Sequence, residues 1–131
     1  MHHVVAVAEV VPHLGGFCQP PVGEHPGQVA VDPDRIGVGG DSAGGALAAA
    51  TAIEAARAGW PCAFQLLVYP ATDLTRSHAS HRTYAEGFYL TRRFMDVATM
   101  GYLPDVAQRT DPRASVLYAD LPAGLAPAYV W

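Results

Sequence analysis

One serine of this chain lies among residues that have little or no side chain. The stretch Gly40-Asp41-Ser42-Ala43-Gly44 fits the pattern G-x-S-x-G, which places a glycine two positions away on either side of the serine. This spacing suits a turn so tight that larger neighbours would collide, with the hydroxyl at its tip. A hydroxyl held in this way can attack a carbonyl carbon, so the stretch indicates nucleophilic catalysis by Ser42.

The segments around this serine predict the strand and helix that such a turn requires. A short apolar strand is expected over Arg35–Gly39, and the alanine-rich segment Ala43–Gly59 predicts a helix that Gly59 ends. The continuous apolar run Ala63–Tyr69 predicts a second strand, buried on both faces of a parallel sheet. Together these segments predict a right-handed strand–helix–strand unit with Ser42 at the carboxyl edge of its sheet.

The remaining segments predict fewer regular elements. Valine-rich residues 3–11 predict a strand, and residues 18–27, rich in proline and glycine, predict a loop. Residues 70–87 and 104–115 are also expected to be irregular. A helix is predicted over Thr91–Leu103, with Thr91 as its N-cap and with Phe94, Met95, Ala98 and Tyr102 on one face. Residues 126–131 predict a last strand. The helix over Ala43–Gly59 should carry Leu47, Ala50, Ile53 and either Ala56 or Arg57 on one face.

Composition excludes several functions. The formal net charge of −4 argues against a nucleic-acid partner, and the chain has no lysine, which excludes a Schiff base and a phosphate-binding P-loop lysine. Cys18 and Cys62 are far apart in the sequence and are typical of reduced thiols in a cytoplasmic protein. The histidines show no metal-ligand spacing. We expect neither a cofactor nor a metal, and no membrane span.

At this point the sequence resembles a known family. The stretch DPDRIGVGGDSAGGALAA is similar to the nucleophile region of hormone-sensitive-lipase-like esterases, a group of the α/β-hydrolase superfamily. The similarity continues through QLLVYPATDL, EGFYLTRRFMD, YLPD, DPRAS and LPAGLAPAYV, so residues 31–130 are family-like and residues 1–30 match poorly. The resemblance implies a single α/β domain over 1–131, with a mostly parallel sheet and flanking helices, that hydrolyses small carboxylic esters without a cofactor.

Family roles transfer to only a few positions. Ser42 corresponds to the nucleophile, and the backbone N–H of Ala43 corresponds to one oxyanion donor. The family's oxyanion loop, H-G-G-G, resembles His13-Leu14-Gly15-Gly16, which makes Gly15 and Gly16 further candidates. Leu14 departs from the pattern, and the loop lies closer to Ser42 in the sequence than the family places it. Either the intervening region is shortened or the likeness is accidental.

The base that would activate Ser42 is not identified. In the family, the acid follows the strand that corresponds to residues 126–131, and the histidine follows the next strand; this sequence ends at Trp131. We therefore expect a truncated fold that lacks its C-terminal strands. Asp73 with His78 or His81 is a local alternative for the acid and base. Asp41 is expected to support the turn, and Asp73 to be structural.

Two other interpretations remain. The chain could be an inactive remnant or an interaction module that self-associates through an exposed sheet edge at residues 126–131. A dinucleotide site starting at Gly37 would follow the pattern G-x-G-x-x-G, but Ser42 occupies its last position and no acidic residue follows at the usual interval. The favoured interpretation is a serine esterase.

Overall fold

The computed structural model describes residues 35–131, and these form two compact units. In the first unit, residues 35–71 join residues 120–131. The second unit is the continuous segment Thr72–Ala119. The strand predicted over residues 3–11, the loop over 18–27 and the oxyanion candidates Gly15 and Gly16 lie outside the described residues, as does Cys18.

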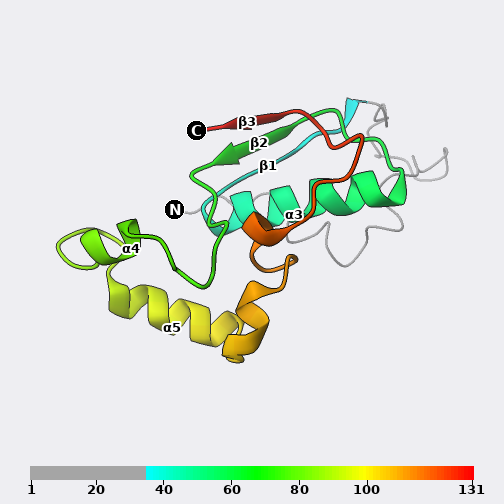
Figure 1. Cartoon of the computed structure of the whole chain (residues 1–131). Coiled ribbons are helices and arrows are strands. Elements are labelled where there is room, and N and C mark those ends of the chain that lie inside the picture. Colours follow the sequence, from blue (N-terminus) through cyan, green and yellow to red (C-terminus); the bar gives the residue numbers. More distant parts are fainter. Residues whose placement is uncertain (1–34) are drawn as a thin grey trace, which may run out of the picture. The chain divides into compact units, whose positions relative to one another are not determined.

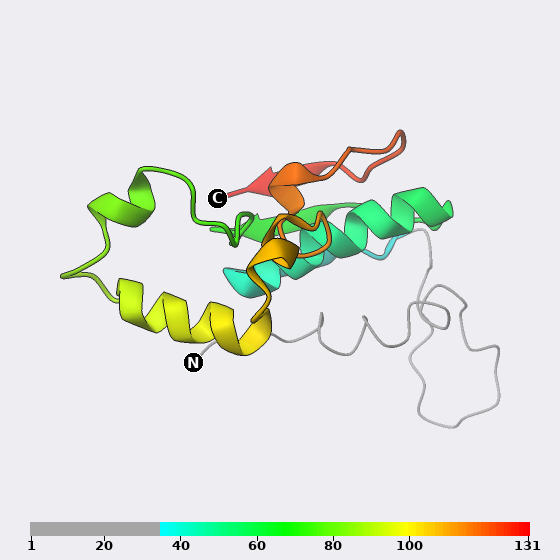
Figure 2. The same cartoon turned by 60° about the horizontal axis from the view of Figure 1, so that its bottom comes forward.

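The first unit is a parallel sheet with a helix against it (Figure 1). The strands β1 (Val38–Asp41), β2 (Gln65–Val68) and β3 (Ala128–Val130) lie in the order β1-β2-β3, and both pairs are parallel. The helix α3 (Ala43–Ala58) connects β1 to β2 and packs against both strands (Figures 1 and 2). This arrangement confirms the predicted parallel strand–helix–strand unit.

The helix α3 ends where the sequence predicts. Its C-cap residue Gly59 has a φ of 71°, and the Gly59 N–H donates to the carbonyl of Ala56. A residue with a Cβ adopts this left-handed conformation only at a cost, so glycine is the residue that ends the helix most easily.

The packed face of α3 agrees with the predicted one only in part: Ile53 is buried as predicted. Leu47 and Ala50 are only half-buried. The buried residues are mostly smaller: Gly44, Gly45, Ala48, Ala49, Thr51, Ala52, Ile53 and Ala55. Residues without long side chains let the helix backbone approach the strands closely, which explains why this face is inside.

The strands are shorter than predicted, and β2 is not buried on both faces. Gln65 and Leu67 are buried, whereas Leu66 between them is 40% exposed within the described chain. The side-chain amide of Gln65 donates to the carbonyl of Ala126 at 2.8 Å, so a polar residue satisfies its hydrogen bond within this unit. Alternation of side chains across a strand explains the pattern: Gln65 and Leu67 share one face.

The second unit contains helices and turns. It comprises the short helix α4 (Ser80–Thr83), the helix α5 (Arg92–Tyr102) and the 3-10 helices η3 (Val106–Thr110) and η4 (Val116–Tyr118). The prediction of irregular structure over residues 70–87 therefore missed α4, and that over 104–115 missed η3. Both are single-turn elements, for which a repeating apolar pattern is too short to be read.

The predicted N-cap of α5 is confirmed. Thr91 has an extended backbone, and its hydroxyl accepts a hydrogen bond from the N–H of Phe94 at 3.3 Å. This contact satisfies one of the N–H groups that the first turn of a helix leaves without a partner.

Candidate active site

The turn at Ser42 joins β1 to α3. Ser42 has φ 52° and ψ −117°, a conformation that is rare for a residue with a side chain. Hydrogen bonds on both sides hold it there: the Ser42 N–H donates to the carbonyl of Val68 at 2.9 Å, and the Ser42 carbonyl accepts from the N–H of Ala71 at 2.9 Å. The last residue of β2 and the loop that follows it thus stabilise the strained serine.

The glycines beside Ser42 are required by direct backbone contact. A Cβ at Gly40 would lie 2.4 Å from the carbonyl carbon and oxygen of Gly44. A Cβ at Gly45 would lie 2.9 Å from the Cβ of Pro70 and 3.1 Å from the carbonyl oxygen of Gly40. A Cβ at either position would displace these neighbours, which explains why glycine stands at positions 40 and 45.

The Ser42 side chain does not cap the helix that follows it. Ser42 is partly exposed, and its hydroxyl makes no capping hydrogen bond to α3. The first turn of α3 contributes N–H groups without intrahelical partners, among them that of Ala43, and the positive end of the helix dipole. A negative charge that developed next to Ser42 would be stabilised there.

Asp73 lies in the second unit and is engaged in a local hydrogen-bond network. It is 8% exposed. One carboxylate oxygen accepts from the N–H and the hydroxyl of Thr75, and the other accepts from the N–H and the hydroxyl of Ser77. Burial raises the pKa of the Asp73 carboxyl, but these four hydrogen bonds outweigh burial and lower the pKa to about 2. Asp73 therefore has the structural role that the sequence predicts.

His78 is a weak partner for this carboxylate. Its Nε2 lies 3.9 Å from an oxygen of Asp73, and its side chain is 63% exposed. A catalytic acid normally holds its histidine by a direct hydrogen bond, and a separation of 3.9 Å is too long for one. Because the lone pairs of Asp73 are directed to Thr75 and Ser77, the geometry does not favour Asp73 and His78 as an acid–base pair.

A buried serine reinforces the same network, and sequence reasoning missed it. Ser115 is fully buried. Its hydroxyl accepts from the N–H of Leu74 at 2.8 Å and donates to the carbonyl of Arg109 at 2.6 Å. The N–H of Leu117 also donates to the carbonyl of Thr72 at 3.1 Å. These bonds join the start of the second unit to its end.

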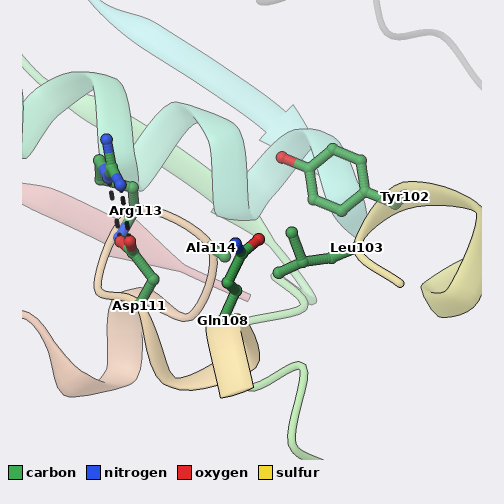
Figure 3. A pocket seen from close by; sticks show the side chains of 6 residues that line it. All are labelled: Tyr102, Leu103, Gln108, Asp111, Arg113 and Ala114. Atoms are coloured by element: carbon green, nitrogen blue, oxygen red, sulfur yellow. Dashed lines mark hydrogen bonds and ion pairs between the residues drawn. The ribbon is translucent and has the colours of Figure 1, made fainter. Parts of the chain in front are cut away.

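A hollow of about 350 Å³ lies within the second unit (Figure 3). Tyr102, Leu103 and Gln108 line it together with Asp111, Arg113 and Ala114. The guanidinium of Arg113 donates two hydrogen bonds to the carboxylate of Asp111, at 3.0 and 2.7 Å, and these bonds lower the pKa of Asp111 to about 2. Because the two charges neutralise each other, the hollow offers no unpaired charge from this pair to a ligand.

Comparison with known proteins identifies the family. A family model described as the alpha/beta hydrolase fold matches residues 10–131, and the chain belongs to this family. A carboxylic ester hydrolase of Mycobacterium tuberculosis, LipN, is 43% identical over 104 residues, which are 75% of this chain and 28% of LipN.

A second relative and a solved structure are also similar to this chain. An ethyl acetate hydrolase of Pseudomonas putida is 32% identical over 102 residues, which are 76% of this chain and 32% of that protein. The structure of a hyperthermophilic esterase from the archaeon Pyrobaculum calidifontis superimposes with a TM-score of 0.70 at 40% identity, covering 76% of this chain and 33% of the esterase. The chain thus spans about a third of the length of these relatives.

Proposed function

We propose that this chain provides the nucleophile of a carboxylic-ester hydrolase and that the nucleophile is Ser42. The observation that carries the proposal is the backbone of Ser42, held at φ 52° between a parallel strand and the N-terminus of α3. The relatives named as ester hydrolases and esterases support the same reaction class. The substrate class is a small carboxylic ester, and the reaction needs no cofactor.

The chemistry follows from the turn. The Ser42 Oγ attacks the ester carbonyl carbon as a base takes its proton, and the carbonyl oxygen becomes an oxyanion. The N–H of Ala43 donates to this oxyanion, with Gly15 and Gly16 as the proposed further donors. As the intermediate collapses, the ester C–O bond breaks and the base returns its proton to the leaving oxygen, so the alcohol departs and leaves an acyl-serine. Water then hydrolyses the acyl-serine and releases the carboxylic acid.

Neither the base nor the acid is identified among the described residues. The hydrogen bonds of Asp73 to Thr75 and Ser77 argue against Asp73 as a catalytic acid that acts with His78. The family resemblance implies that the catalytic acid and histidine lie in segments that follow the strand over residues 126–131. Residues 83–103 are proposed as part of the wall of the acyl pocket. A cytoplasmic location is proposed on the sparse cysteines alone.

A serine-directed probe tests the nucleophile. We expect a fluorophosphonate to label the chain at Ser42, as located by peptide mass spectrometry, and Ser42→Ala to abolish both labelling and any hydrolysis of short-chain p-nitrophenyl esters. Ser77→Ala is the matched control, since Ser77 is exposed and belongs to the Asp73 network. Absence of labelling at Ser42 in the folded chain would refute the proposal.

A second candidate function is supported by the exposed strand β3. Among the described residues β3 pairs only with β2, and Ala128, Tyr129 and Val130 are all exposed. An uncharged outer strand is a template for pairing with another strand. An inactive interaction module would therefore self-associate through this edge. We expect Tyr129→Lys to make the chain monomeric in analytical ultracentrifugation and to leave the extent of probe labelling unchanged.

A further inference from the structure

Tyr69 follows the last residue of β2 and has an unusual backbone. Its φ is 35°, and within residues 35–131 the only other non-glycine residues with a positive φ are Ser42 and Arg76. A bulky residue adopts this conformation at a cost, and the proline at position 70 restricts the residue before it further. Glycine would meet no such cost. The contacts that Tyr69 makes must therefore compensate for its strain.

The strained residue lies in the short link that holds Ser42. Val68, just before Tyr69, accepts a hydrogen bond from the Ser42 N–H at 2.9 Å. Ala71, two residues after Tyr69, donates its N–H to the Ser42 carbonyl at 2.9 Å. The chain must turn sharply between Val68 and Ala71 to present an acceptor and a donor to the same residue, and the positive φ of Tyr69 lies within this turn. The conformation of Tyr69 thus decides whether Ser42 keeps both bonds.

Trp131 holds Tyr69 in this conformation. The parallel strands β2 and β3 end at the same edge of the sheet (Figure 1). There the Tyr69 N–H donates to the Trp131 carbonyl at 2.6 Å, and the Trp131 N–H donates to the Leu67 carbonyl at 3.0 Å. The rings of Tyr69 and Trp131 have centroids 5.9 Å apart and planes inclined at 53°, a geometry in which aromatic rings attract one another. This contact is between the rings and does not need the Tyr69 hydroxyl.

We propose that Tyr69, held against Trp131, is a positioning residue for Ser42. It acts through the carbonyl of Val68 and the N–H of Ala71, which fix the backbone from which the Ser42 hydroxyl projects. All of these residues belong to the first unit. The expected effect on reactivity rests on the proposed role of Ser42 as the nucleophile, whereas the expected effect on the backbone does not.

Three substitutions of Tyr69 separate the ring from the backbone strain. Tyr69→Phe keeps the ring, and Ser42 should react with a fluorophosphonate as fast as in the unaltered chain. Tyr69→Ala removes the ring but keeps the Cβ and its strain, so the labelling rate should fall at least about fivefold. Tyr69→Gly also lacks the ring, but glycine adopts a positive φ without cost and should recover most of the lost rate. A ring with a merely structural role would make glycine at least as damaging as alanine.

Trp131→Ala tests the partner of Tyr69. It should slow the labelling of Ser42 at least about threefold, because it removes the ring against which Tyr69 is held. Tyr129→Ala is the matched control, since Tyr129 is an aromatic residue of β3 whose ring is not paired with that of Tyr69. Its labelling rate should stay close to that of the unaltered chain.

Hydrogen exchange measured by NMR follows the same backbone without chemistry at Ser42. In Tyr69→Ala the amides of Ser42 and Ala71 should exchange at least about fivefold faster. The amide of Val38, which donates to the Phe64 carbonyl at the start of β1, should change little. If Tyr69→Ala does not fold, Trp131→Ala and its control give the same comparison.

The outcomes for the nucleophile and for the positioning residue differ. Absence of labelling in the unaltered chain would count against Ser42 as the nucleophile, and the exchange rates would then decide the role of Tyr69. Unchanged exchange at Ser42 in Tyr69→Ala would overturn the positioning role. So would a glycine variant no better than the alanine variant, or equal effects of Trp131→Ala and Tyr129→Ala. Faster exchange at Ser42 with an unchanged labelling rate would also overturn it.

Discussion

The turn at Ser42 and the network around Asp73 are both sharp changes of chain direction, and they are stabilised by opposite means. At Ser42, glycine backbones touch where side chains are absent, and backbone N–H and carbonyl groups make the hydrogen bonds. At Asp73, a buried carboxylate and the buried hydroxyl of Ser115 make them. The turn at Ser42 therefore depends on the absence of side-chain atoms in glycine, whereas the network around Asp73 depends on polar atoms and on a charge.

The largest effect is expected from adding one methyl group to the Ser42 turn. Gly40→Ala would place a Cβ 2.4 Å from the backbone of Gly44, which cannot move without displacing α3 from β1. We expect a loss of about 3 kcal/mol in the free energy of unfolding, measured by urea denaturation, because this overpacking strains the backbone itself.

The same substitution in the second unit is the control. Gly101 lies inside α5, and a Cβ there would meet nothing within 4 Å. Gly101→Ala should stabilise the chain by up to about 1 kcal/mol, because alanine loses less conformational freedom than glycine in a helix. If both variants changed stability by the same amount, the claim that close backbone contact dictates Gly40 would be wrong.

The next effect is a pH dependence that belongs to the Asp73 network. The pKa of Asp73 is about 2 in the folded chain against 3.8 for an ordinary aspartate. A lowered pKa gives stability that is present above pH 3.8 and is lost as the pH falls toward 2. This difference corresponds to about 2 kcal/mol, and Asp73→Asn should remove it, as seen by denaturation at a series of pH values between 2 and 6.

Comparing Asp111 with Asp73 separates the effect of burial from the effect of a lowered pKa. Its pKa is also about 2, but its partner Arg113 is an exposed arginine. The contribution of Asp111 should weaken in 0.5 M salt because solvent and ions screen exposed pairs, whereas that of Asp73 should persist. Equal sensitivity of Asp73→Asn and Asp111→Asn to salt would contradict the buried network.

The smallest expected effect concerns the N-cap of α5. Thr91→Ala removes the hydroxyl that accepts from the N–H of Phe94, and we expect a loss of about 1 kcal/mol in the free energy of unfolding. Thr91→Ser keeps the hydroxyl and should restore most of the stability. A loss that serine does not recover would show that the threonine methyl group, rather than the cap, stabilises this end of the helix.

Local sequence patterns predicted where helices and strands form better than they predicted which residues of these elements are buried. The helices beginning after Ser42 and Thr91 and the parallel order of the strands were predicted, because caps and apolar runs act over a few residues. The exposed positions of Leu66, Phe94 and Tyr102 were not predicted. They depend on which residues pack against them, and a run of apolar letters does not contain that information.

No helix within residues 35–131 has the length and apolar character needed to cross a bilayer.

The sequence by itself determined the small-residue turn at Ser42, because only glycine lets two backbones come into contact, and this requirement is visible in the residue types. The tertiary structure alone decided that Ser115 is buried beside Leu74 and Arg109, whereas Asp73 is held by its sequence neighbours Thr75 and Ser77. The role of a polar side chain depends on which donors and acceptors surround it, and for Ser115 these come from distant parts of the chain.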